Sequence, residues 1–282
     1  IVFGNNDTPG VVLASAAKEY MKVYGVLVGK KPVVFTNNDS AYETAIEFKK
    51  NNINPIVLDS RQDSNSEIIK EAKSLGIDIK FSHVVVAAKG YKKVKSCDIA
   101  EISEDKQNLN QIKNIECDCI CVSGFWTPTI HLASQSGGKT KFKEEIDAFV
   151  PDKSKQKEVT LGSANGVFTL EETLKTSFDK GFELSKAITN NNNSQQIPKV
   201  SEKKHSKHDK FWCVPLPKGK KYKRFLDFQN DVAVSDIELA IREGYRSIEH
   251  VKRYTTLGMA TDQGKTSNLN GLQLVSNIEN KV

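Results

Sequence analysis

Apolar positions near the start of the chain fall into short continuous runs that are separated by segments with a helical period. Residues 11–25 have apolar positions three and four residues apart and end at Gly25, which predicts a helix. Residues 32–36 are apolar throughout, 40–50 again have a helical period, and 55–59 form a second apolar run. This order of strand, turn, helix and strand predicts a βαβ unit of an α/β fold.

The pattern continues with one more helix and several strands. We expect a helix at 66–76, then an edge strand and two strands in a hairpin. A further strand at 114–124 ends at Ser123-Gly124, and the chain then turns at Pro128 into a helix. Because Gly124 has no side chain, this strand end would let the backbone approach a bound dinucleotide closely.

The later part of the chain has a different organisation. Residues 159–188 predict a strand, a turn of small residues at "GSANG" and a long helix. Backbone amides in such a turn, together with a helix N-terminus, can bind a dinucleotide, and an ordinary glycine-rich connection is the alternative. Residues 190–210 are polar and basic, which predicts a flexible linker, and two short helices follow at 234–244 and 247–258.

The turn of the βαβ unit lacks the glycines of a nucleotide site. Thr36, Asn38 and Ala41 stand where a G-x-G-x-x-G motif would place them, although an acidic residue, Asp59, follows about 20 residues later as in many such sites. Side chains therefore occupy the space that a pyrophosphate needs. The sequence favours a structural Rossmann unit without a nucleotide.

Composition narrows the function classes. A length of 282 residues suggests two domains, and no apolar run is long enough to span a membrane, so we expect no membrane partner. The net charge is +6, with the positive excess concentrated from Lys199 to Arg224. No nucleic-acid motif accompanies that segment, so a solvated linker is favoured over a nucleic-acid site.

The cysteines suggest packed thiols in a reducing compartment. Their number is five, which gives no complete disulfide framework and favours the cytoplasm. Cys117, Cys119 and Cys121 alternate and are expected on one face of a strand, where three cysteines make a poor tetrahedral metal site. We therefore predict no metal.

Three stretches resemble the α subunit of heterotetrameric sarcosine oxidase. They are "VFGNNDTPGVVLASAAKEYMKVYGV", "VSGFWTPTIHLASQSGGK" and, most specifically, "DIELAIREGYRSIEHVKRYTTLGMATDQGKTSNLNG". The chain resembles an internal fragment of that subunit, without its N-terminal dinucleotide fingerprint and its C-terminal folate-binding domain. The resemblance implies an α/β flavoprotein fold with two dinucleotide-binding domains, followed by a module like bacterioferritin-associated ferredoxin.

The same resemblance implies a division of the chain into five parts. Residues 1–25 would end the first half of the dinucleotide-binding domain, 26–114 form an inserted degenerate Rossmann-like domain, 115–189 return to the first domain, 190–210 form the linker, and 211–282 form a small helical domain without a cluster.

The family's activity sets the expected cofactors and partners. Members oxidise sarcosine to glycine, with hydrogen peroxide and either formaldehyde or 5,10-methylenetetrahydrofolate as further products. The α subunit holds NAD and, in its C-terminal domain, tetrahydrofolate. FMN lies at the α/β interface and FAD in the β subunit, so β, γ and δ subunits are the expected partners. An α subunit of a related amine or opine dehydrogenase and a non-catalytic assembly scaffold are the alternatives.

The resemblance also implies site residues, and none of them is catalytic. NAD contacts are expected at Ser163, Ala164, Phe168 and Leu170, to which the strand end adds Gly124. In the C-terminal module, the four places of cluster cysteines hold Asp227, Gln229, Asp262 and Ser267, so a [2Fe-2S] cluster with four thiolates is not expected.

The loop "DQGKTS" of this module has one further candidate role. Its Lys265, Thr266 and Ser267 combine a cation with two hydroxyl groups, which suits the FMN phosphate or a subunit interface. A solvated loop is the alternative.

Overall fold

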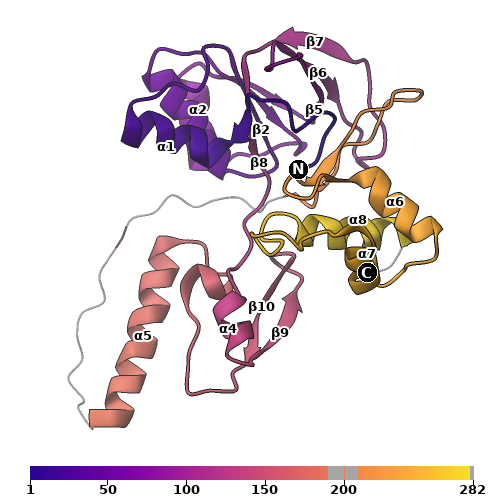
Figure 1. The fold of residues 1–282 in the computed structure, drawn as a ribbon. Coiled ribbons are helices and arrows are strands. Elements are labelled where there is room, and N and C mark those ends of the chain that lie inside the picture. Colours follow the sequence, from indigo (N-terminus) through magenta and orange to yellow (C-terminus); the bar gives the residue numbers. More distant parts are fainter. Residues whose placement is uncertain (190–199, 201–208, 280–282) are drawn as a thin grey trace. The chain divides into compact units, whose positions relative to one another are not determined.

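A computed structural model describes residues 1–189, 200 and 209–279 (Figure 1). The chain folds into two compact units: one contains Ile1–Gly124 and His205–Val282, and the other contains Phe125–Lys204. Most of the linker expected at 190–210 lies outside the described residues. No helix in the described part of the chain is both long and apolar enough to cross a membrane.

The first unit is built on a five-stranded parallel sheet with the strand order β1-β8-β2-β3-β4. Its strands are β1 (Val11–Leu13), β2 (Pro32–Thr36), β3 (Ile56–Asp59), β4 (Asp78–Phe81) and β8 (Cys119–Ser123). The crossover helices are α1 (Ala14–Tyr24), α2 (Ser40–Lys50) and α3 (Glu67–Ser74). The predicted βαβ unit is confirmed as β2, α2 and β3, with Val33 beside Ile56 in the parallel register.

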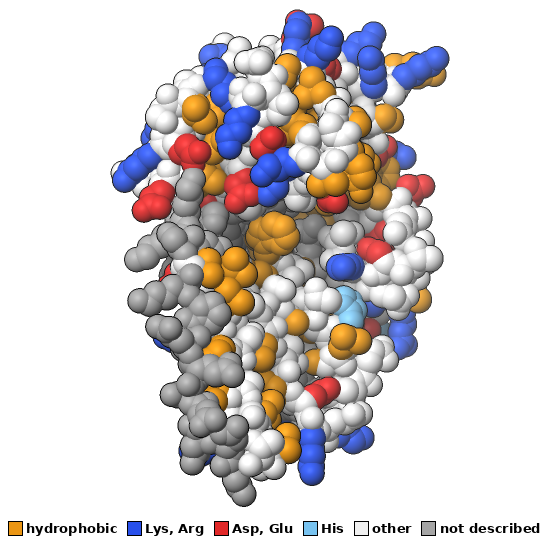
Figure 2. Space-filling view, turned by 90° about the vertical axis from the view of Figure 1, so that its left-hand side faces the viewer, with side chains coloured by type: hydrophobic (Ala, Val, Ile, Leu, Met, Phe, Trp, Pro, Cys, Tyr) orange, Lys and Arg blue, Asp and Glu red, His pale blue; other side chains and the backbone are white. Residues whose placement is uncertain are grey.

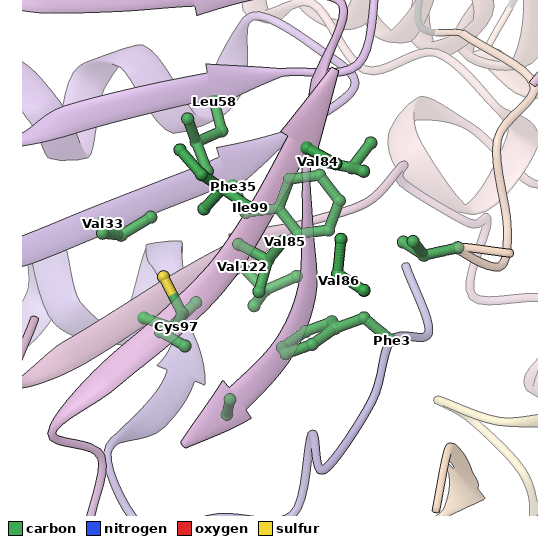
Figure 3. Close-up of a cluster of buried hydrophobic side chains, with 14 of the residues drawn as sticks. Phe3, Val33, Phe35, Leu58, Val84, Val85, Val86, Cys97, Ile99 and Val122 are labelled. Carbon is green, nitrogen blue, oxygen red and sulfur yellow. The ribbon is translucent and has the colours of Figure 1, made fainter. Parts of the chain in front are cut away.

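Both faces of this sheet are covered, which explains the apolar runs in its central strands β2, β3 and β8. On one face, Ala17, Tyr42 and Ile69 of the three helices form a buried cluster with Val34 of β2. The other face packs on an antiparallel sheet of β5 (His83–Lys89), β6 (Ser96–Glu101) and β7 (Lys113–Glu116). Figure 3 shows side chains of the two sheets meeting in this second cluster, among them those of Phe35, Leu58 and Val85.

Two details of the first unit differ from expectation. Residues 11–13 form β1 beside β8, and the helix expected from residue 11 begins at Ala14. The single strand expected at 114–124 is two strands in different sheets, because the chain passes from β7 to β8 at Cys117 and Asp118.

This break changes the placement of one cysteine. Cys119 and Cys121 share the face that packs on the helices, whereas Cys117 packs with Cys97 in the cluster on the opposite face. The prediction that all three lie on one face is wrong for Cys117, because alternation holds only within one strand. All four thiols are buried and free of disulfides.

The C-terminal module also belongs to the first unit. It contains a short ladder of β11 (Phe225–Asp227) and β12 (Val232–Ala233), followed by α6 (Val234–Arg242), α7 (Ile248–Thr255) and α8 (Asn268–Glu279). The two predicted helices are confirmed as α6 and α7, and α8 was not predicted. Ile237 of α6, Val251 of α7 and Leu274 of α8 meet in one buried cluster.

The second unit contains the predicted long helix. Its elements are α4 (His131–Gln135), β9 (Lys139–Lys143), β10 (Ala148–Lys153), the 3₁₀ turn η1 (Gly162–Asn165) and α5 (Leu170–Thr189). The β9-β10 hairpin was not predicted, and no strand directly precedes η1 in the described structure. No residue of α5 is buried among the residues described. Trp126, Leu132 and Ile188 of this unit are exposed, and Figure 2 shows hydrophobic side chains at the surface on one face of the molecule.

The strands on both sides of the expected domain boundaries at 25 and 114 belong to one compact unit. The sheet runs from β1 through β8 to β4, so residues on both sides of positions 25 and 114 lie in it. The division between units falls after Gly124. The five-part division of the chain remains a prediction about the longer fold.

Candidate functional site

The carboxyl ends of β2 and β3 form the edge at which open parallel sheets usually bind ligands. Side chains fill the turn between β2 and α2. Thr36 Oγ1 donates to the carbonyl oxygen of Asn38 at 2.9 Å and accepts from the Asn38 N–H at 3.1 Å. Asn38 Oδ1 in turn accepts from Ser40 Oγ at 2.6 Å. Thr36 and Asn38 are buried, so a pyrophosphate would have to displace them.

A second segment closes this turn from outside. Asn37 Nδ2 donates to the carbonyl oxygen of Asp209 at 2.8 Å, and Lys106 Nζ forms an ion pair with Asp209 at 3.0 Å. Lys106 Nζ also donates to the carbonyl oxygen of Ser60 and lies 5.9 Å from the ring centroid of Phe211. Residues 209–211 therefore cover the edge where β2 and β3 end.

The acidic residue at the end of β3 is also occupied. Arg61 Nη2 lies 2.7 Å from Asp59 Oδ2, its Nη1 lies 2.8 Å from Asp39 Oδ1, and Tyr42 OH donates to Asp59 Oδ2 at 2.8 Å. Burial acts to lower the pKa of Arg61, but the hydrogen bonds and charges of Asp59 and Asp39 outweigh it and raise that pKa. Burial, followed by the charge of Asp59, raises the pKa of the Tyr42 phenol.

These contacts do not fit a dinucleotide in the first unit. Both oxygens of Asp59 accept hydrogen bonds from Arg61, so the carboxylate is not available to a ribose hydroxyl. Sequence reasoning identified the missing glycines but missed Arg61 and the covering segment. The signal for Arg61 is local, since it follows Asp59 by two residues, but Asp209 is distant in the sequence.

The small-residue turn in the second unit has a different character. Gly162 and Gly166 have φ values of 62° and 76°, and a Cβ atom on Gly166 would lie 2.6 Å from Ile146 Cδ1. The turn therefore needs glycine. Ser163 is exposed and Ala164 half-buried, so the first two predicted NAD contacts lie on the turn and reach the surface.

The other predicted NAD contacts differ in position. Phe168 and Leu170 follow the turn directly, and their side chains are 40% and 53% exposed. Ser163, Ala164, Phe168 and Leu170 are near neighbours in the sequence and lie in the segment from η1 to the start of α5. Gly124 is the last residue of the first unit, just after β8, and a Cβ atom there would lie 3.1 Å from the backbone nitrogen of Ile1.

The helix that follows this turn is poorly suited to bind a phosphate. Glu171 and Glu172 lie in the first turn of α5. Carboxylates at a helix N-terminus complement its positive end and repel an added anion. A dinucleotide at this stretch would therefore meet backbone groups and apolar side chains rather than a phosphate-binding helix end.

In the C-terminal module, the four places of cluster cysteines do come together. Asp227 Oδ2 accepts from Ser267 Oγ at 3.5 Å and from the Gly258 N–H at 2.8 Å. Gln229 Oε1 accepts from the Asp262 N–H at 3.3 Å and from Thr261 Oγ1 at 2.8 Å. Hydrogen bonds thus connect these places in two pairs. Among the described residues, no three His, Cys, Asp or Glu side chains are placed to hold a metal ion.

The three residues suggested for an anion point in different directions. Ser267 is fully buried with its hydroxyl on Asp227, and Thr266 Oγ1 donates to Asp262 Oδ2 at 3.1 Å. Lys265 is exposed. Burial acts to raise the pKa of Asp262, but hydrogen bonds from the Gly264 and Thr266 N–H groups outweigh it and lower that pKa. The loop therefore offers an external anion one cation beside a carboxylate.

The parallel sheet with helices on one face and an antiparallel sheet on the other defines an FAD/NAD(P)-binding Rossmann-like fold. A solved structure with this fold is the L-proline dehydrogenase from P. horikoshii, with a TM-score of 0.62 and 20% identity, covering 100% of this chain and 51% of that one. Residues 221–282 match the model of the sarcosine oxidase A3 domain. The chain is similar over 98% of its length to sarcosine oxidase α subunits.

Two curated relatives illustrate this similarity. The sarcosine oxidase subunit alpha of Rhizobium meliloti (strain 1021) is 34% identical over 283 residues, and that of Corynebacterium sp. (strain P-1) is 33% identical over 282 residues. The aligned region is 27% and 29% of their respective lengths. The chain therefore spans less than a third of the curated relatives that it matches.

Proposed function

We propose that this chain forms the scaffold and NAD-binding part of the α subunit of a sarcosine oxidase. The observation that carries the proposal is the continuous similarity to sarcosine oxidase α subunits over 98% of the chain. The match of residues 221–282 to the A3 domain supports the same assignment.

The reaction is that of the whole complex. It would convert sarcosine to glycine, with hydrogen peroxide and formaldehyde or 5,10-methylenetetrahydrofolate as the other products. FAD in a β subunit would accept electrons from the N-methyl group, and FMN between the α and β subunits would pass them to oxygen. Tetrahydrofolate would bind in a part of the α subunit that this chain does not span, and γ and δ subunits would complete the assembly.

The two units would have different roles toward NAD. In the first unit, the turn between β2 and α2 is unsuited to the dinucleotide, because Thr36 and Asn38 fill it and Arg61 occupies Asp59. The second unit offers the exposed stretch of Ser163, Ala164, Phe168 and Leu170 on a turn that glycines shape. NAD contacts in this chain would come from that stretch, and Gly124 stays a separate prediction from its strand end.

The test uses the full-length α subunit with its partner subunits. We expect sarcosine-dependent hydrogen peroxide production, and NAD released on denaturation of the purified complex. Ser163→Trp should lower the NAD content about tenfold, because the indole would fill the surface on which the dinucleotide rests. Ser154→Trp is the matched control, since Ser154 is an exposed serine of the same unit.

Two outcomes would count against the proposal. Equal NAD content in the two tryptophan variants would remove the proposed contacts. Oxidation of a different secondary amine in place of sarcosine would favour a related amine or opine dehydrogenase.

A non-catalytic scaffold is the second candidate, and one observation favours it. The closed turn of the first unit supports it, because contacts of Asn37 and Lys106 hold Asp209 over the edge at which such a fold usually binds a nucleotide. Assembly with partner subunits but without turnover of any amine would support this reading.

For FMN, Lys265 is the proposed contact among the three loop residues. Unchanged FMN content in Lys265→Ala would contradict that contact.

A further inference from the structure

Two lysine-rich segments that are distant in the sequence meet in the first unit. Residues 89–95 read "KGYKKVK" and residues 218–224 read "KGKKYKR". Together they contain nine cationic residues and no acidic residue. Their combined positive charge therefore exceeds the net charge of +6 of the whole chain. The positive excess of the chain is therefore largely gathered in a small part of its sequence.

Contacts between the two segments bring them together on one surface. Lys89 Nζ donates to Tyr222 OH at 3.1 Å and lies 4.8 Å from the centroid of the Tyr222 ring. The N-terminal segment binds near both. The Gly4 N–H donates to the carbonyl oxygen of Val86, in the strand β5 that leads into residues 89–95, at 2.9 Å. The Asn5 N–H donates to the carbonyl oxygen of Lys223 at 2.7 Å. The two segments are thus fixed side by side by the fold.

Most of these cations have no internal partner. Lys89 pairs with Asp98 at 3.1 Å, and Arg224 pairs with Glu238 at 3.4 Å. The remaining lysines are exposed and form no ion pair within 4.0 Å among the residues that the structure describes. They are Lys92, Lys93, Lys95, Lys218, Lys220, Lys221 and Lys223. Gathering like charges in this way destabilises the folded chain unless another molecule neutralises them.

We propose that these seven lysines and Tyr91, here called the lysine surface, bind an acidic segment of another subunit in the same complex. Tyr91 is 92% exposed, although large aromatic side chains are usually covered. An exposed tyrosine surrounded by cations is a suitable central anchor for a protein partner. The inference rests on the proposed function only in taking that partner to be a subunit of the oxidase.

The composition of the lysine surface favours carboxylates over nucleic acid. Bidentate recognition of phosphate uses arginine, whose planar fork binds two oxygens, and this surface has lysines alone. Binding to single strands also needs several aromatic side chains on which bases can stack. Here Tyr91 is available, whereas the ring of Tyr222 is already covered by Lys89. Point charges on flexible stems suit dispersed Asp and Glu side chains.

The first experiment measures binding of a defined probe to the full-length chain. Fluorescein-labelled poly-L-glutamate is titrated at rising salt and followed by anisotropy. We expect binding that weakens steeply with salt, and a loss of about tenfold or more in the triple variant K92E/K93E/K95E and in K220E/K221E/K223E. The triple variant K139E/K175E/K186E makes the same change in charge at lysines of the second unit and should bind like the wild type.

The second experiment tests the partner itself. The complex purified with the full-length chain is passed over a size-exclusion column at increasing salt. The K92E/K93E/K95E complex should dissociate at lower salt than the wild-type and K139E/K175E/K186E complexes, because the attraction between subunits is reduced. An unchanged dissociation point would overturn the proposal, as would tighter binding of duplex DNA than of poly-L-glutamate. NAD content measured on the same samples separates a failure of the proposed function from a failure of the lysine surface.

Discussion

The guanidinium of Arg61 lies 2.7 Å from the carboxylate of Asp59, at the position where an acidic residue of a nucleotide-binding unit would hold a ribose. Arg61 is 7% exposed and Asp59 is fully buried, so the pair is shielded from solvent. The same arginine also binds Asp39. An internal cation thus occupies the carboxylate that would otherwise bind the ligand. This edge of the sheet is therefore structural.

Removal of this cation should be costly. Arg61→Ala leaves Asp59 and Asp39 buried without their cationic partner, and we expect a loss of about 3–5 kcal/mol in the free energy of unfolding. Urea denaturation followed by circular dichroism measures the change. Adding Asp39→Asn and Asp59→Asn to that variant should recover part of the loss, because the buried negative charges are then gone.

An exposed ion pair of the same unit is the control. Lys80 and Asp78 lie 3.4 Å apart, with side chains 39% and 53% exposed. Lys80→Ala should cost between about 0 and 1 kcal/mol. If Arg61→Ala costs as little as Lys80→Ala, the network is not what holds this edge together.

Asp227 should be a stabilising residue of the C-terminal module. Its buried carboxylate accepts from the N–H groups of Gly258 at 2.8 Å and Gln229 at 2.9 Å. Asp227→Ala leaves these donors without an acceptor, and we expect a cost of about 1–3 kcal/mol in the free energy of unfolding. Asn270→Ala removes one exposed hydrogen bond, to the carbonyl oxygen of Thr266, and should be nearly neutral. Equal urea midpoints for the two variants would contradict this role.

The loop at Asp262 should make stability depend on acid pH. Its pKa is lowered in the folded chain, so the unfolded chain binds a proton more readily. The stabilisation is therefore fully present above the unfolded pKa of about 3.9 and is lost as the pH falls through the lower folded value. Asp262→Asn should lower the melting temperature at neutral pH. The loss in the free energy of unfolding should be at most about 1 kcal/mol, because Asp262 is only half-buried and solvent screens its charge.

The pH series supplies its own control. The difference in melting temperature between wild type and Asp262→Asn should shrink as the pH falls below about 4, because the unfolded chain then takes up a proton that the folded Asp262 binds only at lower pH. A difference that stays constant from neutral to acid pH would assign the effect to the amide substitution and not to the charge of Asp262.

The sequence predicted those elements whose pattern is local. β2, α2 and β3 follow from apolar runs and a helical period, because both faces of the sheet are covered. The β9-β10 hairpin was missed because Lys139, Lys141 and Lys143 alternate with only Thr140 and Phe142, and the strand has little apolar character to detect. The break between β7 and β8 was missed because "ECDCICVS" alternates across it without interruption.

The candidate site shows the same limit. The resemblance to a ferredoxin-like module implies that Asp227, Gln229, Asp262 and Ser267 lie near one another, and hydrogen bonds do join Asp227 to Ser267 and Gln229 to Asp262. The closure of the nucleotide edge could not be predicted. It depends on a contact between Asn37 and Asp209, which are separated by 172 positions, and no local pattern encodes such a contact.

The turn before α5 should require glycine at residue 166, and a second glycine of the same unit provides the comparison. Gly166 has a φ of 76°, and an added Cβ would meet Ile146 Cδ1 at 2.6 Å, so Gly166→Ala should destabilise this unit by about 1–2 kcal/mol. Gly181 lies within α5 with no atom within 4 Å of an added Cβ, so Gly181→Ala should stabilise the helix by about 0.5–1 kcal/mol.

Amide hydrogen exchange resolved by mass spectrometry reports on η1 and α5 separately from the first unit. We expect faster exchange in Gly166→Ala and slower exchange in Gly181→Ala. The same direction of change in both variants would show that the conformation at Gly166 does not set the stability of the turn.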